Sequence, residues 1–377
     1  MTRRPSPLIH RFAQPGGRGS SPLRRLDRTL GVALLMALGT LRRGRPAPAA
    51  PRRIGIMKTT GIGDAILASA VVRDVVAAFP RAEVVVFAGV ENAGLARLVE
   101  GARVVEIPAA RPWAALPLLR AERLDVLVDM GQWARLEALY AALSGARWTV
   151  GFSTPGQRRH YAYDATVVHS DRMPELDNLR RLVAPLGVES ASEPRFELSE
   201  QPAPPPAPDP YVVFHLWPGG FRSELREWPQ ESWRELARRM VGEDFSIVLT
   251  GGPGDAERTD EFLRSCGELA GGLVSIAGRC RLPELVDVLA RAHCVVSVNT
   301  GVMHLAAATG VPTVGLNGPT SALRWGPVGP RAVSVDSDLP GCGFLNLGFE
   351  YDGRRTDCMS GISVDRVMAA AREGSRV

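Results

Sequence analysis

The stretch from Ser297 to Thr320, SVNTGVMHLAAATGVPTVGLNGPT, together with the apolar residues before it, predicts a strand, a tight turn, a helix and a second buried strand. We expect the strands over 294–298 and 312–316 and the helix over 302–309. Asn299 and Thr300 stand where a helix N-cap belongs, and both residue types cap well. The amides that follow would point outward with the positive end of the helix dipole, which suits an anion such as a diphosphate. The order of elements places this anion site at the carboxyl edge of a parallel sheet.

The composition indicates a globular protein of about two domains that carries a basic N-terminal tail. The chain has 377 residues, of which 45% are hydrophobic. Its net charge is +5, but residues 1–53 hold twelve arginines and one aspartate, so the rest of the chain carries −6. The basic charge therefore belongs to the tail, and nucleic acid is not an expected partner.

Residues 30–41 of the tail form an apolar run that is too short to span a bilayer. Arginines stand on both sides of this run: Arg24, Arg25, Arg28, Arg42, Arg43 and Arg45. This arrangement favours a helix that lies on an anionic membrane surface through residues 24–45. A disordered or merely docking tail and a signal peptide are the alternatives, although arginines directly after the run disfavour cleavage and export. Residues 44–51 are typical of a linker.

The first domain begins at Arg52 and alternates strands with helices. Its expected elements are a strand over 54–57, a Gly-rich turn over 58–64, a helix over 65–79, strands over 83–88 and 104–107, a helix over 114–123 and a strand over 124–129. This repetition predicts a doubly wound parallel sheet. The Gly-rich turn is not a dinucleotide fingerprint, because Ile66 occupies the third glycine position and Gly89 follows the second strand in place of an acid.

A second domain follows residues 201–210, which contain six prolines and are typical of an extended linker. Expected strands over 211–216, 245–250 and 274–277 alternate with helices over 229–241, 255–266 and 282–292 before the stretch that opens this section. The predicted organisation is therefore a tail over 1–51, an N-terminal domain over 52–200, a hinge over 201–210 and a C-terminal domain over 211–377.

The five cysteines have no CxxC or CxxH spacing, so a metal site is not expected. Their odd number and scattered positions fit a reducing compartment. Cys342 and Cys358 flank one loop and could meet in space, but a pair of free thiols is the favoured interpretation.

Three motifs in order carry a resemblance that covers about residues 24–370: Gly61-Ile62-Gly63-Asp64, Trp228-Pro229-Gln230-Glu231-Ser232-Trp233, and Thr300-Gly301-Val302-Met303-His304 with Gly318-Pro319-Thr320. The chain resembles glycosyltransferase family 9, which contains the ADP-heptose:lipopolysaccharide heptosyltransferases. The resemblance implies a GT-B fold of two Rossmann-like domains facing a cleft. It also implies an inverting transfer that needs no metal or cofactor, and a nucleotide-sugar donor bound mainly by the C-terminal domain. It leaves open whether the last helix packs back on the N-terminal domain.

In the N-terminal domain the resemblance makes Asp64 the base that takes the proton from the acceptor hydroxyl. The alternative is that Asp64 only caps the helix. Lys58 and Thr59, with Gly61 and Gly63 on the same turn, could contact acceptor or phosphate. A solvated lysine is the alternative for Lys58, the one lysine of the chain.

In the C-terminal domain the donor diphosphate is expected to bind backbone amides and one cation. The amides are those of Thr300, Gly301 and Val302, joined by Gly219 and Gly220 after the opening strand of the same domain. Arg226 is the candidate cation, where some family members have a lysine, and a plain surface arginine is the alternative.

Three further residues could contact the donor, each with a structural alternative. His304 could contact phosphate or sugar, or it could be a buried core histidine. Asp255, with Glu257, could bind the ribose hydroxyls, or both could simply complement the helix dipole. Asn299 stands where many family members have aspartate, so it brings no negative charge.

The expected activity is transfer of a sugar, heptose from ADP-heptose, to a lipopolysaccharide-type or other cell-envelope glycolipid acceptor. The expected location is cytoplasmic, peripheral to the inner face of the cytoplasmic membrane. Two other functions stay open: a transferase of the same fold with another nucleotide-sugar donor, and a catalytically weak relative that binds nucleotide-sugar without turnover. The catalytically weak relative stays open because Asn299 stands where many family members have aspartate.

Overall fold

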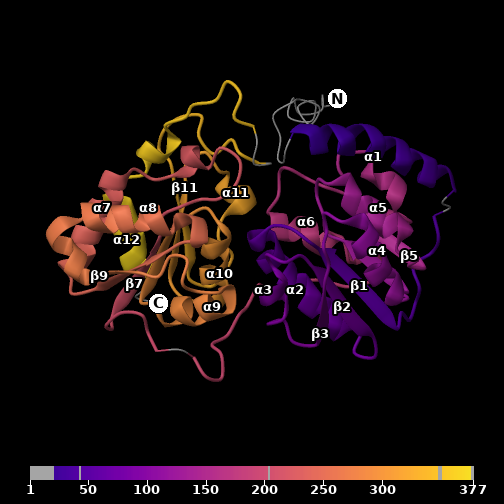
Figure 1. Ribbon diagram of the computed structural model, residues 1–377, viewed down its shortest axis with the longest axis horizontal. Coiled ribbons are helices and arrows are strands. Elements are labelled where there is room, and N and C mark those ends of the chain that lie inside the picture. The colour runs from indigo at the N-terminus through magenta and orange to yellow at the C-terminus, as the bar shows by residue number, and fades with distance from the viewer. Residues whose placement is uncertain (1–20, 42–43, 203, 347–349, 375–377) are drawn as a thin grey trace. The chain divides into compact units, whose positions relative to one another are not determined.

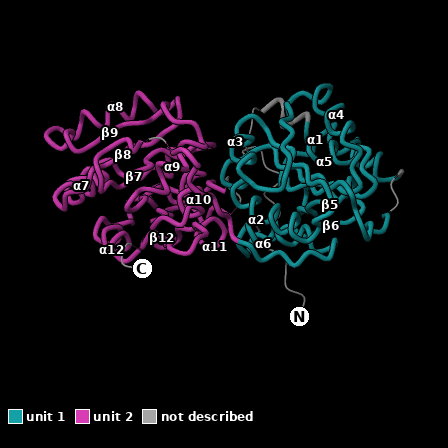
Figure 2. Tube along the Cα trace, turned by 90° about the horizontal axis from the view of Figure 1, so that it is seen from below, with its two compact units in different colours: residues 1–192 teal, residues 193–377 magenta. Residues whose placement is uncertain are grey.

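The computed structural model describes residues 21–41, 44–202, 204–346 and 350–374 (Figure 1), without the side chains of residues 21–26, 28 and 41. Residues 1–20, Arg42 and Arg43 of the predicted tail lie outside the described residues. The chain divides into two compact units, residues 1–192 and 193–377 (Figure 2).

The division differs from the predicted boundary, because residues 193–210 go with the second unit. Hydrogen bonds fasten this segment there. The Phe196 amide donates to the Ala308 carbonyl at 2.9 Å, and the Ser199 amide and hydroxyl donate to the Asp287 carboxylate at 2.8 and 2.7 Å. The Pro-rich stretch over 201–210 therefore lies inside the second unit and follows an anchored segment.

The first unit contains a six-stranded sheet, ordered β3-β2-β1-β4-β5-β6, in which every pairing is parallel. Its strands are β1 (Arg53–Lys58), β2 (Glu83–Ala88), β3 (Ala102–Glu106), β4 (Val126–Asp129), β5 (Trp148–Ser153) and β6 (Ala165–Val168). Its helices are α1 (Ser21–Leu41), α2 (Ile62–Ala78), α3 (Ala93–Ala96), α4 (Pro112–Ala121), α5 (Arg135–Leu143) and α6 (Glu175–Arg181), with short 3₁₀ turns η2 (Arg159–Ala162) and η3 (Ala184–Leu186).

The second unit contains another parallel six-stranded sheet, ordered β12-β11-β10-β7-β8-β9. Its strands are β7 (Tyr211–His215), β8 (Ser246–Thr250), β9 (Leu273–Ser275), β10 (Cys294–Val298), β11 (Thr313–Asn317) and β12 (Ala332–Asp336). Its helices are α7 (Gln230–Val241), α8 (Ala256–Ser265), α9 (Leu282–Arg291), α10 (Gly301–Thr309), α11 (Ala322–Trp325) and α12 (Val364–Gly374), with 3₁₀ turns η4 (Ser223–Arg226), η5 (Pro253–Asp255), η6 (Gly267–Gly272) and η7 (Cys358–Gly361).

Both sheets have the strand order of a doubly wound Rossmann-like fold, so the predicted fold class is confirmed. In such sheets the chain winds outward in both directions from two central strands, and ligands bind beyond the carboxyl ends of those strands. The central pairs are β1 and β4 in the first unit and β7 and β10 in the second. All three motifs of the resemblance lie in loops or helices that follow strands of these sheets (Figure 1).

Two predicted strands, over 83–88 and 294–298, match β2 and β10 residue for residue. The helix after β1 begins three residues earlier than predicted, at Ile62, because Gly61 adopts φ +81° and turns the chain into the helix at once. Strands β5 and β6 and helices α5 and α6 had no counterpart in the prediction.

The predicted apolar helix of the tail exists as α1 and packs on the first unit. Leu35 is fully buried in the same cluster as Met57 and Tyr140. The Asp27 carboxylate accepts from the amides of Arg135 and Leu136 at 3.0 and 3.2 Å, which satisfies the start of α5. Among the helices that the structure describes, none is both long enough and apolar enough to cross a membrane.

The last helix, α12, packs against β10, β11, β12 and α7 of its own unit. Val367 and Met368 on its inner face are buried in the core that surrounds Trp228 and Trp233. The Trp228 indole donates to the Ile362 carbonyl at 3.0 Å, just before the helix begins. These contacts assign α12 to the second unit.

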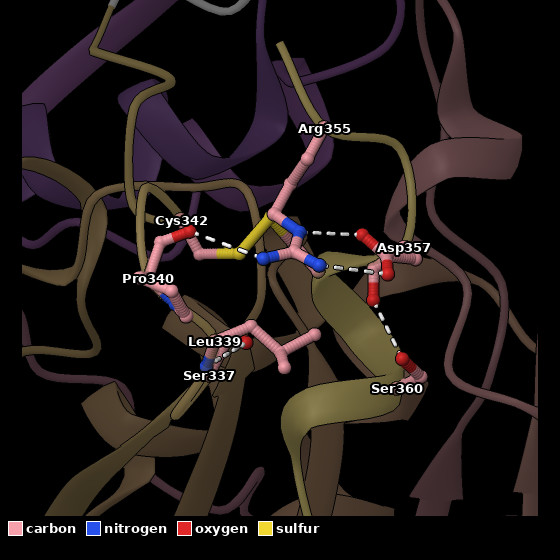
Figure 3. Close-up of a disulfide and its surroundings, with 8 residues drawn as sticks. Ser337, Leu339, Pro340, Cys342, Arg355, Asp357 and Ser360 are labelled. Atoms are coloured by element: carbon pink, nitrogen blue, oxygen red, sulfur yellow. Dashed lines mark hydrogen bonds and ion pairs between the residues drawn. A yellow bond between two sulfur atoms is a disulfide. The ribbon is translucent and has the colours of Figure 1, made fainter.

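Cys342 and Cys358 form a disulfide with their Cα atoms 5.7 Å apart (Figure 3), which corrects the prediction of two free thiols. Further bonds join the segments around the two cysteines, because the Arg355 guanidinium donates to the Pro340 carbonyl at 3.2 Å and the Asp338 amide donates to the Gly361 carbonyl at 3.0 Å. The other cysteines, Cys266, Cys280 and Cys294, are free thiols. Sequence spacing alone does not show such a return of the chain.

Candidate functional site

Lys58 and Asp64 form an ion pair at the carboxyl end of β1, with Nζ 3.0 Å from Oδ2. Both side chains are largely buried, at 5% and 13% exposure, so Lys58 is not the solvated lysine that was the alternative for this position. The N-cap of α2 is Gly61, and Asp64 lies within the first turn rather than at the cap. A Cβ atom at Gly61 would lie 2.9 Å from Asp64 Oδ2, so this position must be a glycine for the carboxylate to face Lys58.

The turn around Thr59 is fixed by buried hydrogen bonds. The Thr59 hydroxyl donates to Glu137 Oε1, and the Asn92 amide donates to the Lys58 carbonyl at 3.0 Å. A Cβ atom at Gly89 would lie 2.1 Å from the Thr59 carbonyl oxygen, which explains why a glycine follows β2. Thr59 is therefore bound to the protein, and Gly63 lies in the first turn of α2 beside Asp64.

A buried charge network lies below this turn, at the end of β4. Arg159 and Asp129 are fully buried, with Nη2 2.8 Å from Oδ2, and the Tyr163 hydroxyl donates to the same oxygen at 2.6 Å. Burial raises the pKa of Asp129 to about 6; Arg159 opposes this rise and the nearby Glu137 adds to it. Sequence reasoning missed this network, although Asp129 ends a predicted strand next to β1.

A second buried cluster follows β4 and β6. His169 Nε2 lies 3.2 Å from Glu175 Oε2, and the Gln132 amide donates to the same carboxylate. The Asn178 amide reaches it from one turn further along α6, at 3.4 Å. No motif in the sequence pointed to this cluster. One reason is that Gln132 and Glu175, which bond to each other, lie more than forty residues apart in the chain.

In the second unit the N-terminus of α10 is capped by Thr300, whose hydroxyl accepts from the Val302 amide at 3.2 Å. Thr300, Gly301 and Val302 are all partly exposed at the carboxyl end of β10. The Val302 amide, one of the three predicted diphosphate donors, thus already has an intramolecular acceptor. The helix dipole and the exposed amide edge still favour an anion at this place.

Asn299 does not cap α10, so one of the two residues predicted to cap this helix does not do so. Its amide nitrogen donates to Asn317 Oδ1 at 2.7 Å and to the Trp325 carbonyl at 2.8 Å. A carboxylate could make neither bond. The amide side chain therefore has a structural reason in this chain, since it ties β10 to β11 and α11.

Gly219 and Gly220 are exposed after β7, and Gly220 adopts φ +95°. Arg226, in η4, donates from Nη2 to the Gly219 carbonyl. Arg226 is thus tied to the glycine turn by a hydrogen bond and is not a free surface arginine, the alternative considered for it. Trp217, just before this turn, is 4% exposed; its indole donates to Thr259 and Arg258 stacks on its ring at 4.3 Å. These bonds fasten the indole within the protein.

The Asp255 carboxylate accepts from the Gly252 amide at 2.8 Å and from Arg258 at 2.6 Å. These contacts close the loop before α8 and favour the structural interpretation of Asp255. Glu257 is exposed, and His304 is buried at 5% exposure in the middle of the α10 core face. His304 is therefore buried, whereas the Asp255 side chain is 23% exposed in the loop that follows β8.

His215, at the end of β7, is a buried residue that sequence reasoning missed. Its Nδ1 lies 2.9 Å from the Thr250 hydroxyl, one strand away in β8. Burial lowers the pKa of His215 to about 4, while Asp255 and Thr250 oppose the change. The ring is therefore neutral at pH 7. Across the described part of the chain, no three His, Cys, Asp or Glu residues gather in a way that could hold a metal ion.

Residues 167–342 match the family model described as glycosyltransferase family 9 (heptosyltransferase). The chain is 40% identical over 133 residues to lipopolysaccharide heptosyltransferase 1 of Pseudomonas aeruginosa, with 35% of each chain covered. It is 28% identical over 183 residues to lipooligosaccharide heptosyltransferase 2 of Haemophilus influenzae, covering 46% of this chain and 50% of that one. The aligned stretches span between about a third and a half of these curated relatives.

Solved structures agree in fold along most of the chain. The Escherichia coli ADP-heptose heptosyltransferase II has a TM-score of 0.70 at 19% identity, covering 86% of this chain and 98% of that one. An Escherichia coli heptosyltransferase solved with ADP has a TM-score of 0.67 at 20% identity, covering 85% and 99%. Both sheets therefore correspond to the GT-B architecture. The chain is therefore similar to glycosyltransferase family 9 over residues 167–342, and its fold agrees with that of solved heptosyltransferases along most of its length.

Proposed function

We propose that this chain transfers heptose from ADP-heptose to a lipopolysaccharide-type glycolipid, with inversion at the anomeric carbon and without a metal ion. The observation that carries the proposal is the pair of switch points. A buried, ion-paired Asp64 stands at one, and an exposed amide edge with Arg226 beside it stands at the other. Residue types at the two edges match the two halves of a glycosyl transfer, since one must receive a proton and the other must receive an anion.

In the first unit the Asp64 carboxylate is the proposed base. It takes the proton from the acceptor hydroxyl as that oxygen attacks the anomeric carbon of the donor. Lys58 fixes one carboxylate oxygen at 3.0 Å, and the bonds of Lys58 and Thr59 to Asn92 and Glu137 fix the turn. Attack from one face with departure from the other inverts the anomeric centre.

In the second unit the leaving diphosphate is the proposed ligand of the α10 N-terminus, the glycine turn and Arg226. The bond from the anomeric carbon to the diphosphate breaks, and its electrons stay on the diphosphate oxygen. Partial positive charge at the helix start and the Arg226 guanidinium stabilise that charge. Adenine and heptose are proposed from the relatives, which are named as heptosyltransferases and one of which was solved with ADP.

The outer face of α1 supports a proposed location on an anionic membrane surface. Leu30, Leu34 and Met36 are 55%, 51% and 43% exposed, while the opposite face of the helix is buried on the first unit. Exposed leucines at this density are unusual in a helix that already packs through its other side. With arginines before and after the helix in the sequence, this face suits a headgroup layer of anionic lipid.

The membrane proposal is tested by co-sedimentation with phosphatidylglycerol vesicles. Leu30→Glu with Leu34→Glu should weaken vesicle binding by about tenfold or more, because two half-exposed leucines no longer enter the lipid and two negative charges are added. The matched control is Val90→Glu with Trp113→Glu, since both residues are 76% exposed elsewhere in the first unit. Equal binding of the two double variants would exclude α1 as the contact surface.

The donor proposal is tested by thermal unfolding with ADP, UDP, GDP or dTDP in EDTA. A ligand at a hundred times its Kd adds about 2.7 kcal/mol to stability, so selective stabilisation by ADP is the expected result. Transfer from ADP-heptose in EDTA, with the anomeric configuration of the product assigned by NMR, then tests the reaction. ADP binding without transfer to any glycolipid acceptor would identify a binding protein. Selective stabilisation by another nucleotide would replace the donor.

A further inference from the structure

Helix α1 meets the rest of the first unit along one face, whose residues recur every four positions. Asp27, Gly31, Leu35 and Gly39 lie on this face, and Leu35 is fully buried. A Cβ atom at Gly31 would lie 3.1 Å from Arg135 Cβ, and one at Gly39 would lie 2.8 Å from an aromatic ring carbon in η2. The two glycines therefore let α1 approach α5 and η2 closely (Figure 1).

Asp27 of α1 supplies the cap that α5 lacks. The N-cap residue of α5 is Ala134, whose side chain has no hydrogen-bond acceptor. Asp27 Oδ1 accepts from the Arg135 and Leu136 amides, and Oδ2 accepts from the Arg135 guanidinium at 2.9 Å. A carboxylate at a helix start also complements the positive end of the helix dipole. The first turn of α5 is therefore fastened by a residue that lies 108 positions earlier in the chain.

Glu137, the next residue of this first turn, binds the loop that leads to the proposed base. Its Oε1 accepts from the Thr59 hydroxyl, and both residues are buried. A Cβ atom at Gly131 would lie 2.1 Å from Glu137 Oε2, so the glycine after β4 leaves the space that this carboxylate occupies. Thr59 follows Lys58, whose Nζ lies 3.0 Å from Asp64 Oδ2. Direct contacts and adjacent residues therefore join α1, through α5, to the Asp64 carboxylate.

We propose that Asp27 and Glu137 are positioning residues for Asp64. Asp27 fixes the first turn of α5, and Glu137 fixes, through Thr59, the turn that aims the Asp64 carboxylate. The inference rests on the proposed function, in which Asp64 is the base. A base acts when it lies within hydrogen-bonding reach of the acceptor hydroxyl, and a displacement of about 1 Å can lower a rate by about a hundredfold. Helix α1 therefore serves the reaction as well as the proposed membrane contact.

The test measures kcat and KM for transfer from ADP-heptose to the lipopolysaccharide-type acceptor that the wild type uses, dissolved in detergent so that vesicle binding does not enter. Glu137→Ala should lower kcat by about tenfold to a hundredfold. Asp27→Ala should lower kcat by about threefold to tenfold, because Asp27 is one contact further from the base. The Kd for ADP should stay the same in both variants, since the diphosphate is assigned to the second unit. Wild-type kcat in either variant overturns the inference.

Conservative variants test the hydrogen bonds themselves. Glu137→Gln keeps an oxygen that accepts from Thr59, and Asp27→Asn keeps one that accepts from the two amides, so both should keep most of the wild-type kcat. Thr59→Val removes the hydroxyl and nearly preserves the shape of the side chain, so it should lower kcat as Glu137→Ala does. A glutamine variant as slow as the alanine variant would show that the charge of Glu137 is required in place of its bond to Thr59, and this result overturns the inference.

The decisive comparison repeats Glu137→Ala and Asp27→Ala in the Asp64→Asn background. The residual kcat should not fall further there, because no base is left to position. A role in stability alone would lower kcat by the same factor in both backgrounds, and that result overturns the inference. Glu137→Ala should likewise add nothing to the effect of Thr59→Val, since the two side chains act through one hydrogen bond.

Asp125→Ala is the matched control for Asp27→Ala. The Asp125 carboxylate also accepts from two backbone amides, those of Arg52 and Arg53 at 2.8 and 3.1 Å, but it does so where β1 begins, at the opposite end of that strand from the Gly-rich turn. Its kcat should equal that of the wild type, and a loss as large as that of Asp27→Ala would overturn the inference.

The proposed function and this inference fail in different ways. Wild-type turnover in Asp64→Asn refutes the proposed base and the inference together. Lost turnover in Asp64→Asn with normal turnover in Glu137→Ala refutes the inference alone and leaves Asp64 as the base.

Discussion

The two switch points share a strand order and differ in their chemistry. At the end of β1 and β4, charged side chains are buried in pairs, as in Lys58 with Asp64 and Arg159 with Asp129. At the end of β7 and β10, the exposed groups are backbone amides and glycines, with Arg226 beside them. One edge is suited to moving a proton, and the other to binding an anion.

The fold supplies one switch point in each unit, and the residues at the strand ends decide the chemistry of each switch point. Buried pairs fix the direction of a carboxylate, which a proton acceptor needs. Open amides bind a charge that forms only during the reaction, and they need no reorganisation. Substitutions at each switch point test these differences, and the expected effects decrease from Asp64 to Asn299.

The largest effect is expected from Asp64→Asn. The amide keeps the size of the side chain but cannot take a proton, so kcat should fall by about 10²- to 10⁴-fold. ADP should bind with unchanged Kd, because the diphosphate is assigned to the other edge. The measurement is ADP-heptose turnover beside ADP calorimetry on the same protein.

Asp64→Asn also has a matched control in helix α8, Glu261→Gln, which removes an exposed carboxylate that has no assigned role. Its turnover should equal that of the wild type. Equal rates for Asp64→Asn and the wild type would remove Asp64 from the reaction and leave the first edge with a structural role only.

The next effect concerns stability and is expected from Asp129→Ala. The substitution leaves the fully buried Arg159 without its carboxylate partner, and such a loss typically costs about 3–5 kcal/mol. Urea unfolding followed by tryptophan fluorescence measures it. Asp129→Leu with Arg159→Met should recover most of the lost stability, since no buried charge remains. A single variant as stable as the wild type would mean that water reaches Arg159.

The two edges should also respond to pH in opposite directions. The pKa of Asp129 is raised to about 6, so its contribution is present below the unfolded pKa of about 4 and is lost as pH rises through 6. The pKa of His215 is lowered to about 4, so its contribution is present above 6.5 and is lost as pH falls towards 4. Each of these two pKa differences between the folded and unfolded states corresponds to about 3 kcal/mol in the free energy of unfolding.

His215→Gln isolates the contribution of His215 to the pH dependence of stability. Glutamine can still bond to the Thr250 hydroxyl but does not titrate, so the variant should lose less stability than the wild type between pH 6.5 and 4, by up to about 3 kcal/mol. Urea midpoints at half-unit steps of pH give the slope directly. Parallel curves for the two proteins would contradict a neutral, buried His215.

Local patterns predicted the parts of the fold that local physics decides. The apolar runs over 83–88 and 294–298 gave β2 and β10, and the Gly-rich turn placed Asp64 at the start of a helix. A Cβ atom at Gly61 would clash with Asp64, and one at Gly89 would clash with Thr59. These steric reasons for glycine become clear only from the structure.

Long-range partners account for the rest. Arg159 meets Asp129 from thirty residues away, and Cys342 meets Cys358 across sixteen residues of the C-terminal loop. The sequence left open whether Lys58 is solvated, and its ion pair with Asp64 shows that it is not. Asn299 looked like a cap, yet the hydroxyl of its neighbour Thr300 takes that role. For Arg159 with Asp129, and for Asn299 with Asn317, the decisive factor is which strand end lies beside which, and this is a property of the sheet order.

The smallest effect, and the sharpest check on the donor edge, is expected from Asn299→Asp. Asn299 donates to the Trp325 carbonyl and to Asn317 Oδ1, while the Asn317 nitrogen is already bonded to the Ser334 hydroxyl at 2.6 Å. A carboxylate would face two oxygens, so stability should fall by about 1–3 kcal/mol in urea unfolding.

The Asn299→Asp carboxylate would also bring negative charge towards the proposed diphosphate, and ADP binding should weaken most at low salt. Asn299→Ala loses the same bonds without the charge, so a difference in ADP affinity between the two variants measures the charge alone. If Asn299→Asp instead proved as stable as the wild type and bound ADP as well, the edge would tolerate the residue found in many family members, and the amide at position 299 would not be explained by its bonds to β11 and α11.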